Sequence, residues 1–159
     1  MTKQDRTIGQ ALDAFLRITD EFPVSKVANS EDVEIVNEAV QVDLNFRDLF
    51  MGLPNHIDIN TCVEIVSYFL ALSNEKDKVA YYSILSSYMF ELGDTELANS
   101  LIDEALKVNL DYSLAKLLKR VYAQMPSNIF IEMRNQLDHK VRKTASEMKD
   151  IKLSELVNA

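Results

Sequence analysis

The sequence predicts an all-α fold, a single-domain helical bundle of about seven or eight helices. Two features of its composition support this prediction. The chain of 159 residues has the length of one ordinary domain, and it contains only three Gly and three Pro, the residues that most often interrupt helices. Apolar residues also recur three and four positions apart, which places them on one face of a helix. We expect one α-helical domain over residues 1–152, built around a hairpin at 76–109, and a candidate disordered tail at 153–159.

The first expected helix covers about residues 7–20 and buries one apolar stripe. The stripe consists of Ile8, Leu12, Phe15, Leu16 and Phe22. Because proline lacks a backbone N–H, this helix is expected to end before Pro23. Ser30 is the expected N-cap of a second helix, whose first turn carries Glu31 and Asp32 at the positive end of the helix dipole.

Two further helices are expected in the middle of the chain. The segment DLNFRDLFMGLP, residues 43–54, predicts a short third helix that its Gly and Pro end. A fourth helix begins with Asp58 or Asn60 as its N-cap. Its apolar residues are Cys62, Val63, Ile65, Val66, Phe69, Leu70 and Leu72. They surround most of the helix, which is typical of a helix at the centre of a core.

The strongest helical pair follows at about residues 76–109. Gly93 is expected to end the first helix in the left-handed conformation, and Asp94 or Thr95 to cap the second, which predicts an αα-hairpin. A further helix begins at Asp111 or Tyr112 and ends before Pro126. The last expected helix starts with Ser127 as a cap and runs to about Lys149.

This hairpin resembles one tetratricopeptide repeat. The matching positions are Tyr82, Leu85, Gly93, Ala98, Ile102 and Ala105, whereas Ser86 and Leu110 depart from the pattern. A shift of one repeat, about 34 residues, finds no second copy on either side. Because a repeat array needs about three units, we interpret the hairpin as the core of a bundle.

A second resemblance covers roughly Asp43 to Leu118. The order NFRDLFMGLP, an apolar helix, and then the hairpin with its following link is similar to the C-terminal helical region of an actinobacterial domain-of-unknown-function family. The family's Arg-Asp pair corresponds to Arg47 and Asp48, its GDGALA-like turn to Gly93–Ala98, and its link to Ala105–Ala115. The resemblance implies a fold and no activity. A compact version of this region that is encoded by itself is compatible with an origin in a phage or another mobile element.

No catalytic or cofactor motif is present in the sequence. It lacks the glycine-rich loops that bind nucleotide phosphates, and its single cysteine excludes a Cys-rich zinc site. His56 and His139 lie far apart, the first near a helix start and the second on an exposed helix face. Cys62 is expected to pack in the core as an unreactive thiol. We therefore predict no cofactor, no metal site and no enzymatic activity. The alternatives left open are a metal site of His, Asp and Glu ligands and a hydrolase or transferase with an unrecognised site.

The formal charge of -8 argues against direct binding to nucleic acid, because phosphates are also negative. The acidic residues concentrate in residues 1–60, which carry five basic and eleven acidic side chains, whereas residues 126–159 carry six basic and five acidic ones. No apolar run approaches the roughly 18 residues of a membrane span, and no secretory signal is evident. We expect a soluble, cytoplasmic protein.

These observations favour a non-catalytic protein-interaction module, an acidic adaptor or regulator with a protein partner that is basic or neutral. The candidate binding residues are Glu31, Asp32, Glu34, Glu38, Tyr81, Tyr88 and Tyr112. Tyrosine side chains are enriched at binding hot spots, which makes the three tyrosines candidates. The alternative is an acidic nucleic-acid mimic that blocks the basic surface of a nucleic-acid-binding protein. Homo-oligomer formation is left open.

Overall fold

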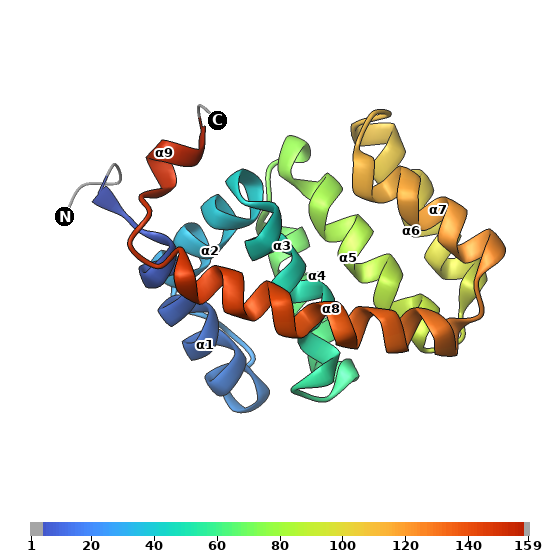
Figure 1. Cartoon of the computed structure of the whole chain (residues 1–159), viewed down its shortest axis with the longest axis horizontal. Helices are drawn as coiled ribbons and strands as arrows, with labels where there is room; N and C mark the ends of the chain where they lie inside the picture. The colour runs from blue at the N-terminus through green and yellow to red at the C-terminus, as the bar shows by residue number, and fades with distance from the viewer. Residues whose placement is uncertain (1–4, 158–159) are drawn as a thin grey trace. The chain divides into compact units, whose positions relative to one another are not determined.

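The computed structural model describes residues 5–157, and this part of the chain is all-helical (Figure 1). Its nine α-helices are α1 (Ile8–Ser25), α2 (Ser30–Val42), α3 (Leu44–Met51), α4 (Ile59–Leu72), α5 (Lys78–Glu91), α6 (Thr95–Val108), α7 (Ser113–Gln124), α8 (Ser127–Glu147) and α9 (Leu153–Val157). Two short 3-10 helices, η2 (Leu53–Asn55) and η3 (Glu75–Asp77), precede α4 and α5. The all-α prediction is confirmed.

The described residues divide into two compact units. The terminal unit comprises residues 5–49 and 138–157, and the central unit comprises residues 50–137. The boundary falls inside α3 and inside α8, so each of these helices contributes residues to both units. The single-domain assignment for residues 1–152 stays a prediction.

In the terminal unit, α1 and α2 pack against each other and bury their apolar stripes. The buried side chains of these two helices are Ile8, Ala11, Ala14, Phe15, Ile18, Phe22, Ile35, Val36, Ala39 and Val40. Phe15 meets Phe46 of α3 edge to face, with ring centroids 6.0 Å apart. Helix α1 starts with a capping box, in which Thr7 and Gln10 satisfy each other's backbone N–H groups.

Two helix boundaries here differ from the sequence-based expectation. Helix α1 continues through Pro23 to Ser25 and ends at Lys26, which adopts the left-handed conformation and donates its backbone N–H to Phe22 O. Pro23 has no N–H to donate to Thr19 O, so the helix loses that one backbone bond and continues for only two residues beyond the proline. Helix α2 is capped by Asn29 and not by Ser30, since Asn29 Oδ1 accepts from the N–H groups of the first turn.

The expected disordered tail also differs in the structure. Residues 153–157 form α9, and the Leu153 side chain is fully buried. The Leu153 N–H donates to Arg6 O at 2.8 Å, so an apolar anchor and a backbone bond hold this segment in place. Residues 158–159 lie outside the described residues.

The central unit is built around α5, whose buried residues lie on nearly all of its sides. Edge-to-face contacts join Phe50 to Phe69 and to Tyr81, and the Tyr88 hydroxyl donates to Phe50 O. A buried ion pair links Arg134 Nη2 on α8 to Glu91 Oε1 on α5 at 2.7 Å. Of the two expected caps for α4, Asp58 is the one observed.

Helices α5 and α6 form an αα-hairpin, as predicted. Gly93 has a φ of 86°, the left-handed conformation expected at the end of α5. Asp94 Oδ1 then caps α6 by accepting the Leu97 N–H at 3.0 Å. Ala98, Ile102 and Ala105 of α6 are fully buried. The likeness of this hairpin to a tetratricopeptide repeat stays a prediction.

Within residues 5–157, no helix combines the length and apolar character that crossing a membrane requires.

Candidate functional site

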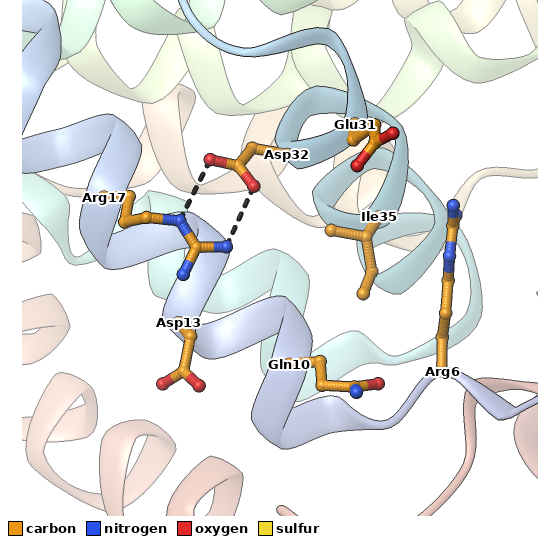
Figure 2. A pocket seen from close by; sticks show the side chains of 7 residues that line it. All are labelled: Arg6, Gln10, Asp13, Arg17, Glu31, Asp32 and Ile35. Carbon is orange, nitrogen blue, oxygen red and sulfur yellow. Dashed lines mark hydrogen bonds and ion pairs between the residues drawn. The ribbon is translucent and has the colours of Figure 1, made fainter. Parts of the chain in front are cut away.

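An open cleft of about 450 Å³ lies between α1 and α2 of the terminal unit (Figure 2). It is lined by Arg6, Gln10, Asp13, Arg17, Glu31, Asp32 and Ile35. Six of these seven side chains are polar or charged, and Ile35 supplies an apolar surface between them. We refer to it below as the α1–α2 cleft.

The helical repeat explains why these residues share one face. Gln10, Asp13 and Arg17 are three and four residues apart on α1, the spacing of neighbours on one side of a helix. Arg6 precedes the capping box at the start of α1. The first two turns of α2 supply the opposite wall, including the apolar contact of Ile35.

One side of the cleft is held by a bidentate ion pair. Arg17 Nε and Nη2 donate to Asp32 Oδ2 and Oδ1 at 3.1 and 2.9 Å. This hydrogen bonding raises the pKa of Arg17 from its ordinary value. An exposed pair contributes little to stability, roughly 0–1 kcal/mol. Its consequence is geometric, because it ties α1 to the first turn of α2.

On the other side, Arg6 reaches two carboxylates of α2. Its Nη1 lies 3.2 Å from Glu34 Oε1 and 3.5 Å from Glu38 Oε2. The Arg6 side chain is 18% exposed, so most of it is covered by the protein. Figure 2 shows Arg6 and the Arg17–Asp32 pair on opposite sides of Ile35.

Two carboxylates of the cleft remain without such a partner. Asp13 and Glu31 are exposed, and neither makes an ion pair with any residue in 5–157. Together with Asp32, Glu34 and Glu38, they place five carboxylates around two guanidinium groups. The net field is therefore negative and favours a cation. An apolar contact beside it suits the methylene stem of a Lys or Arg side chain.

The acidic candidates from the sequence lie in or beside this cleft. Asp32, Glu34 and Glu38 are engaged by the chain's own arginines, and Glu31 is the member of the set that lines the cleft without an ion pair. The sequence reasoning missed Arg6, Gln10, Asp13, Arg17 and Ile35. The spacing of the three α1 residues was a usable signal for their common face, but nothing in it indicates which other helix they meet.

The three tyrosine candidates all belong to the central unit. Tyr81 and Tyr88 are fully buried in the central unit, so the structure does not expose the rings that the prediction requires, and their role in partner binding stays a prediction. Both belong to α5, which is surrounded by the core, and burial raises the pKa of Tyr88 well above its ordinary value. Tyr112 is half-buried at the N-cap of α7.

The side chains considered for chemistry do not converge. His56 follows η2 and His139 lies on α8, and both are exposed. Cys62 is buried on α4, where burial raises the pKa of its thiol to about 12, with a smaller contribution from Glu91. Among residues 5–157, no three His, Cys, Asp or Glu side chains are grouped so that they could hold a metal ion.

In comparisons with protein-family models, curated proteins and solved structures, no match to this chain was found. The resemblances to the actinobacterial family and to a tetratricopeptide repeat therefore stay predictions.

Proposed function

We propose that the protein is a non-catalytic interaction module that binds a basic segment of a protein partner in the α1–α2 cleft. The observation that carries this proposal is the excess of carboxylates around the cleft, five against two guanidinium groups. A negative, open site of this kind attracts and orients positive groups. The formal charge of -8 acts in the same direction at longer range.

The lining of the cleft suits a long basic side chain better than a compact cation. A Lys or Arg residue of a partner presents a charged head on an apolar stem. Among the residues that line the cleft, Glu31 suits the charged head and Ile35 the apolar stem.

The nucleic-acid mimic receives less support from the same geometry. A mimic of phosphate charge needs a run of carboxylates that are free to meet a basic surface. Here Asp32, Glu34 and Glu38 already pair with Arg17 and Arg6. A single cleft for one or two basic side chains is the simpler proposal.

The test compares Glu31→Gln with Glu96→Gln. Both residues are exposed glutamates in the first turn of a helix, α2 and α6 respectively, so both substitutions remove the same charge from the same type of position. The probe is a short capped peptide with two arginines, titrated into isotope-labelled protein and followed by amide NMR shifts. A peptide of equal length with two glutamates is the negative control.

We expect the arginine peptide to shift amide signals around Gln10 and Ile35. Glu31→Gln should weaken its binding by about two- to fivefold, the usual effect of one exposed charge, and Glu96→Gln should leave binding unchanged. Equal effects of the two substitutions would mean that only net charge matters. Shifts confined to the central unit, or no shifts at all, would contradict the proposal.

A further inference from the structure

The segment Lys149–Leu153 lies along the start of α1 and forms three backbone hydrogen bonds, two with α1 and one with Arg6, which precedes it. The Ile8 N–H donates to Ile151 O at 2.9 Å and the Gly9 N–H donates to Lys149 O at 2.8 Å. In the other direction, the Leu153 N–H donates to Arg6 O at 2.8 Å. We call this segment the C-terminal clasp (Figure 1).

The clasp is a close and specific contact. A Cβ at Gly9 would lie 2.8 Å from Lys149 O, so the chain approaches at a distance that a glycine accommodates and a larger residue would disturb. Leu153 is fully buried, and Lys152 Nζ lies 3.9 Å from Asp5 Oδ1. Helix α9, which begins at Leu153, also packs against α2.

Arg6 joins the clasp to the α1–α2 cleft. Its backbone carbonyl accepts the Leu153 N–H, and its side chain runs along the cleft to Glu34 and Glu38. In this position the guanidinium group of Arg6 forms ion pairs with two of the five carboxylates that surround the cleft. Chemically it is the same group that the proposed partner would supply.

We propose that Arg6 is an internal competitor for the basic partner and that the C-terminal clasp holds it in place. This inference rests on the proposed function of the cleft. With the clasp closed, Arg6 covers Glu34 and Glu38 and repels an incoming cation. When the clasp opens, Arg6 loses its backbone anchor, and its competition with the partner for these carboxylates weakens.

Three substitutions test this arrangement. Arg6→Ala removes the competitor, and Arg120→Ala, at an exposed arginine of α7 in the central unit, is the control for the change in net charge. Leu153→Pro removes the N–H that bonds to Arg6 O, and proline is tolerated at the first position of a helix, which Leu153 occupies in α9. Leu153→Ala is a second way to loosen the clasp, through loss of its buried side chain.

With the same arginine peptide as the probe, Arg6→Ala should bind about two- to fivefold more tightly than the original protein, and Arg120→Ala should show a smaller change. Leu153→Pro and Leu153→Ala should also tighten binding. Combined with Arg6→Ala, neither Leu153 substitution should tighten peptide binding further, because both act through Arg6. Equal effects of the clasp substitutions with and without Arg6 would overturn the inference, as would weaker binding by Arg6→Ala.

Amide hydrogen exchange separates this inference from the proposed function. Opening of the clasp by Leu153→Pro should speed exchange at Ile8 and Gly9, whose N–H groups bond to the clasp, without any ligand present. If exchange responds and no protein variant binds the arginine peptide, the proposed function fails. If the original protein binds and the clasp variants bind equally well, the function stands and the competitor role of Arg6 is wrong.

Discussion

The thiol of Cys62 illustrates how burial controls chemistry at a single residue. Its side chain is fully buried on α4, and desolvation raises its pKa from 9.0 to about 12, with Glu91 adding to the shift. A thiolate in this position would lose its hydration without gaining an equivalent partner. The group is therefore protonated and unreactive in the folded protein at neutral pH.

This pKa shift predicts a dependence of stability on pH. In the unfolded chain the thiol ionises above about pH 9, whereas in the folded protein it keeps its proton up to about pH 12. Unfolding between these values releases a proton, so the free energy of unfolding should fall by up to about 1.4 kcal/mol per pH unit. Cys62→Ala should lack this contribution, which denaturant titrations of both proteins at several alkaline pH values would measure.

A thiol reagent provides an independent check of the same residue. The native protein should react slowly at mildly alkaline pH, and the denatured protein should react at once. Rapid modification of the native protein would show that Cys62 is accessible and that its pKa is not raised.

At the scale of elements, the α5–α6 hairpin depends on small side chains. Ala98 and Ala105 lie on one face of α6 and are fully buried, which lets α5 and α6 approach closely. Gly93 provides the left-handed residue between the helices, and no atom lies within 4 Å of the position of a Cβ there. Its role is therefore one of backbone conformation, whereas the role of the alanines is one of packing.

Ala98→Leu should overpack this contact and lower the free energy of unfolding by roughly 1–3 kcal/mol. Ser100→Leu, two residues further along α6 at an exposed position, is the matched control and should change stability little. Thermal or denaturant unfolding monitored by circular dichroism would measure both. Equal stability of the Ala98→Leu variant would mean that α6 does not pack as described.

At the scale of the whole molecule, the division into two compact units raises the question of cooperativity. Helix α3 passes from one unit to the other between Leu49 and Phe50, and helix α8 does so between Leu137 and Asp138. Each of these helices has residues in both units. If only one unit unfolded, the helix would lose the backbone hydrogen bonds that cross the boundary. This favours a single transition for the chain.

We therefore expect a substitution in either unit to shift the same unfolding transition. Gly9→Ala is suited to the terminal unit because its Cβ would collide with Lys149 O, and Ala98→Leu is suited to the central unit. Far-ultraviolet circular dichroism and near-ultraviolet signals of the tyrosines should give coincident curves for both variants. Two separated transitions, each moved by only one of the substitutions, would contradict this expectation.

Local signals in the sequence determined the all-α fold and many helix boundaries. Apolar spacing located the helices, and Gly93, Asp94 and Asp58 were identified as terminal residues because caps act over only a few residues. Pro23 and residues 153–157 were misjudged. In the first case the loss of one backbone bond does not end the helix, which the Lys26 N–H closes on Phe22 O, and in the second a distant partner, Arg6 O, stabilises the segment.

Only the tertiary structure determined the site. The acidic residues of α2 were visible in the sequence, but their pairing with Arg6 and Arg17 depends on how α1 packs against α2. The burial of Tyr81 and Tyr88 likewise depends on the helices around α5. Hydrophobic periodicity specifies which face of a helix is buried and not which helix covers it, so the cleft and the clasp were beyond the reach of local patterns.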